Sequence, residues 1–89
     1  MTYKLGFSAV AWDDYLHWQQ TDKAVLRRLN VLLRELQRTP FAGIGKPELL
    51  RHARAGTWSR RLTEEHRLVY MVDNDFVVVL QARFHYSEK

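Results

Sequence analysis

The spacing of apolar residues divides the chain into a helical part and a strand-like part, which limits the possible folds more than any other feature. Apolar side chains recur at three- and four-residue intervals over residues 9–20 and again over residues 23–38, as on one face of an amphipathic helix. Ser8 is placed to cap the first helix, and Asp22 stands where the second would begin. Pro40 disfavours further helical turns, so the second helix is expected to end before it.

Alternating or continuously apolar segments indicate strands in the rest of the chain. The alternation in residues 2–7 predicts a strand at the start, and residues 57–63, 66–72 and 76–86 read as three more. The polar connections "TEEH" and "DND" between the last three are typical of turns. Residues 40–48, "PFAGIGKPE", carry both prolines and two glycines, so we expect a loop there. The order β-α-α-β-β-β predicts an α+β fold in which two helices pack on one face of a mainly antiparallel sheet.

Length and composition fit a single domain of this kind. The chain has 89 residues, so one domain is expected over residues 1–89, with 87–89 as a short tail. It contains no cysteine, which excludes disulfides and thiolate metal sites, and no two of His17, His52 and His66 have metal-ligand spacing on a common helix. We therefore expect neither a metal nor another cofactor. The first residues lack the features of a signal peptide, and no apolar run reaches the ~20 residues that cross a bilayer, so a cytoplasmic location is expected.

Arginine dominates the positive charge and gathers in two segments. The formal net charge is +4, and ten of the fourteen Lys and Arg residues are arginine. Residues 23–38 hold five cations against one carboxylate, and residues 51–67 hold five against two. Because the planar guanidinium suits phosphate, a polyanionic partner is favoured, either a nucleic acid or an acidic protein. A membrane surface is disfavoured, because the basic residues do not form an amphipathic helix with a large free apolar face.

Alternation along the predicted strands assigns charged side chains to one face of the sheet. We expect the more apolar sets to face the helices; in the last strand that set begins with Phe76, Val78 and Leu80. The residues then left on the open face are Arg61, Arg67, Gln81, Arg83 and His85. The same rule places Arg60 on the helix side, where we expect it at the edge of the sheet.

This open face has side chains suited to cleavage of RNA by its own 2′-hydroxyl. Arginine stays protonated and can neutralise charge on the phosphorane, whereas a histidine such as His85 can donate a proton near neutral pH. Glu48 is the natural candidate for the base, because it is the sole carboxylate between Glu35 and Glu64. On the residues alone, the chain is a basic α+β domain that binds RNA or cuts it without a metal. A partner-binding arginine face with a bystander histidine remains the alternative.

Four segments of the sequence carry a resemblance to a known family. They are "WDDYLHWQQTDK" (12–23), "RTPFAGIGKPELLRH" (38–52), "GTWSRRLTEEHRLVY" (56–70) and "ARFHY" (82–86). In their order and separations they resemble the YoeB toxins, of the RelE/ParE superfamily of bacterial toxin–antitoxin modules, over nearly the whole chain. The resemblance implies a RelE-like fold. It also implies a ribosome-dependent endoribonuclease (an mRNA interferase) that enters the vacant A site and cuts the codon there, which inhibits translation.

The same resemblance implies roles for individual residues. Glu48 falls on the family's general base, Arg67 on its phosphate-stabilising arginine and His85 on its general acid. Tyr86 matches a tyrosine that positions the nucleotide, and Arg51 stands where the family pattern has a lysine, which keeps the charge without the ability to share a proton. Arg61 lies on the predicted open face and also matches a basic position of the family's site. The expected substrate-binding residues are therefore Arg61 on both grounds, Arg83 from the alternation, and Arg51 and Tyr86 from the resemblance. The tail "SEK" after the tyrosine has no counterpart in many family members.

The expected partners also follow from the resemblance. They are a YefM-like antitoxin that masks the catalytic face, the ribosome with its mRNA at the A site between the 30S and 50S subunits, and a second copy of the chain in a homodimer. Operator DNA would be bound only through the antitoxin complex, and no membrane is expected. The main alternative is a non-enzymatic inhibitor of gyrase, as in the ParE branch, which shares the fold without this acid–base set. A DNA-binding repressor is a third reading, but the sequence has no helix-turn-helix signal.

Overall fold

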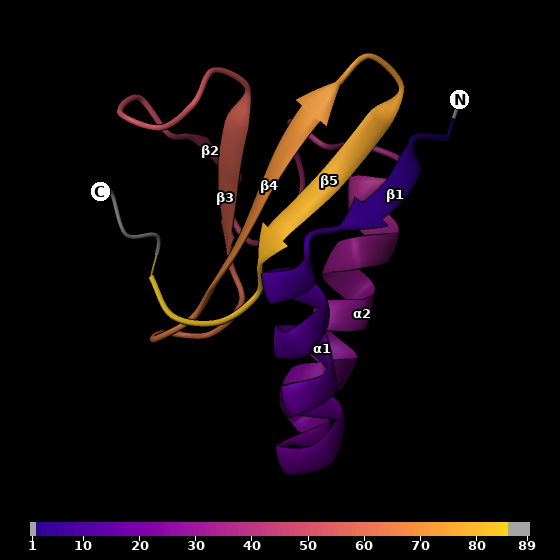
Figure 1. Cartoon of the computed structure of the whole chain (residues 1–89), viewed down its shortest axis with the longest axis vertical. Coiled ribbons are helices and arrows are strands. Elements are labelled where there is room, and N and C mark those ends of the chain that lie inside the picture. Colours follow the sequence, from indigo (N-terminus) through magenta and orange to yellow (C-terminus); the bar gives the residue numbers. More distant parts are fainter. Residues whose placement is uncertain (1, 86–89) are drawn as a thin grey trace.

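The computed structural model describes residues 2–85, which form two helices and a five-stranded sheet (Figure 1). In chain order the elements are β1 (Lys4–Phe7), α1 (Ala9–Thr21), α2 (Lys23–Leu36), β2 (Glu48–Leu49), β3 (Thr57–Arg61), β4 (Arg67–Asp73) and β5 (Phe76–Gln81). The strand order in the sheet is β1-β5-β4-β3-β2. β1 runs parallel to β5, and the other neighbouring strands are antiparallel. The predicted α+β arrangement, with two helices against a mainly antiparallel sheet, is confirmed.

Side-chain caps set the starts of both helices where the sequence predicted them. The Ser8 hydroxyl oxygen accepts a hydrogen bond from the Ala11 amide at 3.0 Å, and the same hydroxyl donates to the Leu80 carbonyl at 2.9 Å. The Asp22 carboxylate accepts from the amides of the first turn of α2. α2 ends at Leu36, two residues earlier than expected. Ser8 therefore does more than cap α1, because it also ties the helix to β5.

The core lies between α2 and the sheet. One face of α2 presents Leu29, Leu32, Leu33 and Leu36, all buried, to side chains from β4 and β5. Figure 1 shows the upper end of α2 behind β1, with α1 beside it. Trp18 of α1 is also buried, and its indole Nε1 donates to the Ala82 carbonyl at 2.8 Å. Neither helix is long and apolar enough to cross a membrane, as judged over residues 2–85.

The assignment of β5 to its two faces was wrong. Val77 and Val79 are fully buried in the core, whereas Phe76 is 39% exposed and Val78 is only half-buried. From Phe76 to Leu80 both alternating sets are apolar, and the polar residue that distinguished them, Gln81, comes only at the end of the strand, so their composition did not show which one faces the helices. Burial against α1 and α2 decided it.

A β-bulge explains why Gln81 nevertheless lies on the open face. Tyr70 pairs with Val79, but the preceding residue, Val69, pairs with Gln81, so Leu80 is an extra residue in β5. Gln81 therefore shares the face of Val69, and its predicted position is confirmed although the alternation used to derive it is broken. β5 also ends at Gln81 instead of continuing to residue 86, so alternation does not orient residues 82–85.

β2 was not predicted, and it moves Glu48 from a loop to the edge of the sheet. Residues 40–47 form the expected loop, but Glu48 and Leu49 pair antiparallel with Ser59 and Trp58 of β3. A strand of two residues directly after Pro47 has no periodicity that a sequence pattern could reveal. The pairing places Glu48 level with Ser59 on the open face.

Arg60 is fully buried on the helix side, not at the edge of the sheet as expected. Its guanidinium forms an ion pair with Glu35 of α2. It also donates hydrogen bonds to the Tyr70 hydroxyl and to carbonyl groups of the loop, so protein atoms take the place of water around it. The loop carbonyls that it holds are those of Thr39, Ala42 and Ile44. A buried guanidinium needs such a set of acceptors, and the loop after α2 supplies them. The loop that leads to β2 is thereby fixed to β3.

Candidate functional site

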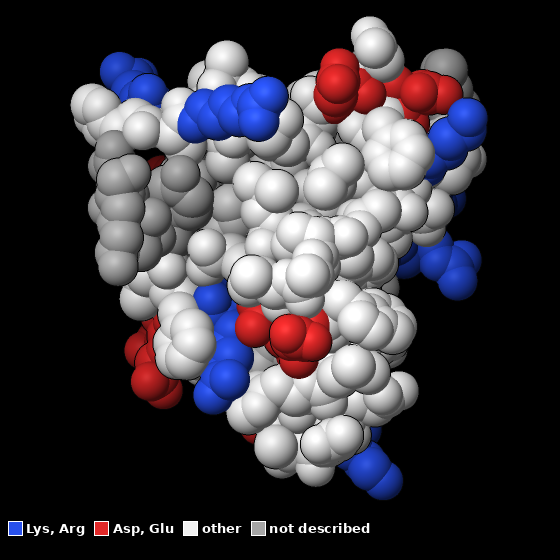
Figure 2. All heavy atoms as spheres, in the orientation of Figure 1, with Lys and Arg blue, Asp and Glu red and all other residues white. Residues whose placement is uncertain are grey.

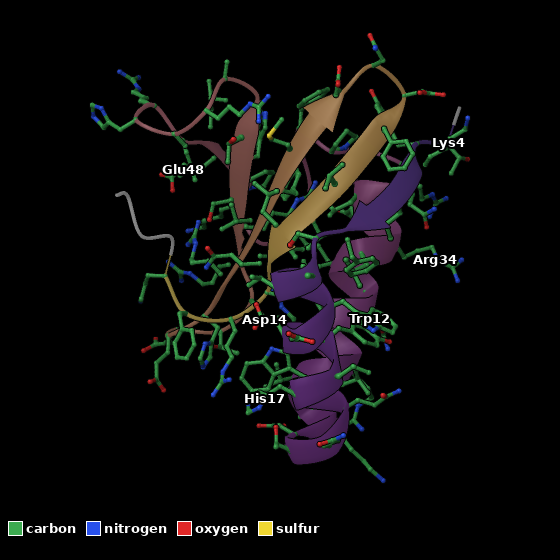
Figure 3. All side chains as sticks on the ribbon, viewed as in Figure 1. Lys4, Trp12, Asp14, His17, Arg34 and Glu48 are labelled. Atoms are coloured by element: carbon green, nitrogen blue, oxygen red, sulfur yellow. The ribbon has the colours of Figure 1, made fainter. Side chains whose placement is uncertain are left out.

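Glu48, Ser59 and Arg67 form a row across three neighbouring strands on the open face. The Arg67 Nε donates to the Ser59 hydroxyl at 2.8 Å, and its Nη2 lies 3.5 Å from Glu48 Oε1. Ser59 is buried, the Arg67 side chain is 18% exposed, and the Glu48 side chain is 67% exposed. The buried Ser59 hydroxyl therefore fixes the Arg67 guanidinium, while the Glu48 carboxylate lies on the edge strand β2 and is exposed to solvent. Figure 3 shows Glu48 on β2, well apart from the two helices.

This row suits a reaction in which a proton is removed beside a phosphate. The Arg67 Nε is held by Ser59 and its Nη2 meets Glu48, whereas its Nη1 makes no hydrogen bond within residues 2–85 and can meet an anion. The contact with Glu48 is long and exposed, and such ion pairs contribute at most about 1 kcal/mol. The carboxylate can therefore exchange its contact with Arg67 for a substrate hydroxyl at little cost.

His85 follows the turn after β5, and backbone contacts hold that turn against the start of β4. The Arg67 amide donates to the Phe84 carbonyl at 3.0 Å. The Gln81 side-chain amide donates to the carbonyls of Arg83 at 2.9 Å and His85 at 3.3 Å. The His85 side chain is exposed. These bonds bring the backbone of His85 next to Arg67, although no hydrogen bond among the described residues joins the His85 ring to Glu48 or Arg67.

The other predicted cations differ in their surroundings. Arg61 pairs in register with Arg67 and is exposed, and Arg51 is exposed in the loop after β2. Arg83 is half-buried, with its guanidinium 4.6 Å from the centre of the Phe84 ring. Tyr86 lies outside the described residues. In Figure 2 the visible Lys and Arg side chains are separated from one another by uncharged and acidic residues, so this view shows no continuous cationic patch.

Sequence reasoning missed the residue that anchors the central arginine. Ser59 shares the strand face of Arg61, and this alternation was the available signal for its position. Nothing in the sequence showed that its hydroxyl would accept from Arg67, because that contact depends on the pairing of β3 with β4.

The fold defines a class of protein: a small α+β toxin of the RelE/YoeB type, whose solved structures have the same two helices and mixed sheet. Residues 7–86 match the family model described as the YoeB-like toxin of bacterial type II toxin–antitoxin systems, and the chain belongs to this family. The family resemblance predicted from the four sequence segments is confirmed.

Individual relatives agree with this assignment. The chain is 53% identical to Toxin YoeB of Escherichia coli (strain K12) over 83 residues, which cover 93% of this chain and 99% of that toxin. It superposes on a YoeB/ParE toxin from Agrobacterium tumefaciens with a TM-score of 0.87 at 49% identity, covering 93% and 99% of the two chains. Staphylococcus aureus YoeB is similar both as a dimer (TM-score 0.87, 39% identity) and in a YoeB–YefM complex (TM-score 0.82, 37% identity). Each of these alignments covers 97% of this chain and 100% of the other.

Proposed function

We propose that this toxin is a ribosome-dependent endoribonuclease that cuts mRNA at the A-site codon. The observation that supports the proposal most directly is the row of Glu48, Ser59 and Arg67. It puts an exposed carboxylate 3.5 Å from a guanidinium whose Nε is anchored by Ser59. A base and a phosphate-binding cation must stand side by side when a 2′-hydroxyl attacks the adjacent phosphate.

In the proposed reaction, the Glu48 carboxylate takes the proton from the 2′-hydroxyl. The oxygen attacks the neighbouring phosphorus, and the bond from phosphorus to the 5′-oxygen of the next nucleotide breaks. Arg67 and Arg61 stabilise the negative charge on the phosphoryl oxygens, and His85 gives a proton to the leaving 5′-oxygen. The products are a 2′,3′-cyclic phosphate and a 5′-hydroxyl; Glu48 takes up one proton from the substrate and His85 gives one to it, so the step balances.

The remaining residues of the site are assigned to substrate binding. Arg51, in the loop after β2, and Arg61, the last residue of β3, are both exposed and can contact backbone phosphates. Arg83 packs on Phe84 beside the backbone of His85, so its charge lies next to the proposed general acid. Tyr86 is assigned to positioning the nucleotide on the family resemblance.

Dependence on the ribosome fits the shape of the site. The row lies on the sheet face that the helices leave uncovered, and the side chain of Glu48 is 67% exposed. Such a site has little surface with which to orient a flexible RNA, so a scaffold that holds the codon in place supplies the alignment that the protein lacks. We place this activity in the cytoplasm, where translating ribosomes are found.

The relatives support two protein partners. Because S. aureus YoeB forms a complex with YefM and was solved as a dimer, we propose a YefM-like antitoxin and a homodimer for this chain. The antitoxin would cover the catalytic face, and operator DNA would be reached only through that complex.

Primer extension on mRNA with stalled ribosomes tests the proposed function. With wild-type protein the extension should stop at a new 5′ end within the A-site codon, and the same mRNA without ribosomes should stay intact. A YefM-like antitoxin added before the toxin should abolish the cut. If no cut appears with ribosomes and the protein instead inhibits gyrase in a supercoiling assay, the nuclease proposal is wrong and the ParE-like alternative holds.

A further inference from the structure

His66 lies in the connection between β3 and β4 and is not used by the proposed mechanism. Its ring packs edge-on against Trp18, with the ring centres 4.8 Å apart. The centre of the Phe84 ring lies 5.8 Å from the centre of the His66 ring. Its Nδ1 lies 2.8 Å from the backbone nitrogen of Phe84. The histidine therefore contacts helix α1 on one side and the turn that leads to His85 on the other.

The chemistry of this contact fixes the protonation of the imidazole. A backbone N–H can only donate, so Nδ1 must carry a lone pair and the ring proton must be on Nε2. The ring is neutral in this arrangement. A protonated ring would present a second donor to the Phe84 amide, and the bond would be lost.

The turn that His66 holds comprises residues 82–85, and it needs outside support. Phe84 has φ +64°, a left-handed conformation that is strained for a residue with a bulky side chain. Ala82, two residues before Phe84, is held by helix α1: its amide donates to the Asp14 carboxylate at 2.9 Å, and its carbonyl accepts from the Trp18 indole. Figure 3 shows Asp14 on α1, close to the yellow segment that leaves β5.

His66, just before β4, and Arg67, the first residue of β4, bind the backbone of Phe84 at its amide and at its carbonyl. The His66 ring accepts from the Phe84 amide, and the Arg67 amide donates to the Phe84 carbonyl at 3.0 Å. The residue after Phe84 is His85. The backbone that carries the proposed general acid is thus tied to the proposed phosphate-binding arginine through its immediate neighbour in the chain.

We propose that His66 is a positioning residue: its neutral Nδ1 holds the strained Phe84 peptide, and so sets the place of His85 relative to Arg67. This inference rests on the proposed function, since it concerns the general acid of that reaction. It assigns His66 no contact with the substrate.

Two substitutions distinguish the effect of the hydrogen-bond acceptor at Nδ1 from the effect of the aromatic ring. His66→Phe keeps an aromatic ring against Trp18 and Phe84 but removes the acceptor. His66→Asn loses the ring but returns a carbonyl oxygen near the position of Nδ1. We expect His66→Phe to lower kcat for A-site cleavage about tenfold with KM unchanged, and His66→Asn to stay within about threefold of wild type. His52→Phe, at an exposed histidine outside the site, is the control and should cut at the wild-type rate.

The order of the two variants distinguishes positioning from packing. If His66 acts only by filling space, His66→Asn should be the more impaired variant, because it loses the contacts with Trp18 and Phe84, and the proposal is then overturned. A kcat of His66→Phe equal to that of the wild type overturns the proposal as well. Thermal unfolding of both variants shows whether a loss of rate follows a loss of folded protein.

Nuclear magnetic resonance tests the inference independently of any nuclease activity. In wild-type protein, the ¹⁵N signals of His66 should show an unprotonated Nδ1 coupled through the hydrogen bond to the Phe84 amide. His66→Phe should lose the protection of that amide against hydrogen exchange, while amides within α2 stay protected. If wild type makes no cut but these signals are found, the proposed function fails and the contact stands; if the coupling is absent in a protein that cuts, the positioning role fails alone.

Discussion

Arg60 of β3 and Glu35 of α2 form an ion pair of 3.1 Å in which the arginine side chain has no exposed surface and the carboxylate is 27% exposed. The same Glu35 oxygen accepts from the Ile44 amide at 2.7 Å, and the guanidinium reaches the carbonyls of the loop before β2. One buried charge therefore links a helix, a strand and the segment that delivers Glu48 to the edge of the sheet.

Replacement of Arg60 should strongly destabilise the fold. Arg60→Met leaves the Glu35 carboxylate and several loop carbonyls without their donor, and breaking a buried pair in this way costs about 3 kcal/mol. Urea unfolding at one fixed protein concentration measures the free energy of unfolding. Arg61→Met, at the exposed neighbouring arginine, is the matched control and should change that free energy by less than about 0.5 kcal/mol. Equal effects of the two substitutions would contradict the structural role of Arg60.

Tyr70 should make the stability fall in alkaline solution. Burial raises the pKa of Tyr70 above its usual 10.0, although the hydrogen bond and charge of Arg60 oppose the shift. A raised pKa means that the folded state keeps its phenolic proton after the unfolded state has lost it. The contribution to stability is therefore fully present below pH 10.0 and is lost as the pH rises towards the folded-state pKa.

Tyr70→Phe tests this dependence on pH. The variant should be less stable at neutral pH by about 1 kcal/mol, because the hydroxyl that donates to Pro40 at 2.6 Å is gone. Above pH 10.0 its stability should fall less steeply than that of the wild type. Unfolding curves across the alkaline range decide the point, and identical slopes for the two proteins would show that Tyr70 does not titrate with unfolding.

Ser59 should affect the rate of cleavage through Arg67. Ser59→Ala removes the acceptor 2.8 Å from the Arg67 Nε, so the guanidinium loses its fixed orientation and kcat should fall about fivefold with KM little changed. Thr57→Val is the control on the same strand face, because the Thr57 hydroxyl is buried without a hydrogen-bond partner among residues 2–85. That variant should keep the wild-type rate. A Ser59→Ala protein as active as the control would exclude the anchoring role.

Loss of the Glu48 carboxylate should remove the proposed base. Glu48→Gln keeps the size and the hydrogen-bonding reach of the side chain but cannot take up a proton, and cleavage at the A site should slow by at least about 100-fold. Because its side chain is 67% exposed and its ion pair is weak, the free energy of unfolding should change by less than about 0.5 kcal/mol. Primer extension gives the rate, and urea unfolding gives the stability. Wild-type cleavage by this variant would rule out Glu48 as the base.

Local patterns in the sequence were sufficient for most of the secondary structure. The helical spacing of the α2 leucines, the Ser8 cap and the turn between β4 and β5 all appear in the structure, because each depends on residues within a few positions of one another. Arg61, Arg67 and Gln81 were correctly predicted on the open face. The short strand β2 and the end of β5 were not predicted, since neither has a periodic pattern of its own.

The sequence by itself determined which segments become helix and strand and which residues could carry acid–base and phosphate chemistry. Only the tertiary structure decided that Val77 and Val79 face the helices, that Arg60 is buried and that Glu48 of β2 meets Arg67 of β4 across β3. The reason is that alternation assigns residues to two faces without saying which face is covered. The bulge in β5 and the contacts between distant residues, such as Glu35 with Arg60 or Phe84 with His66, form only when segments far apart in the chain pack together. A local sequence pattern therefore does not reveal them.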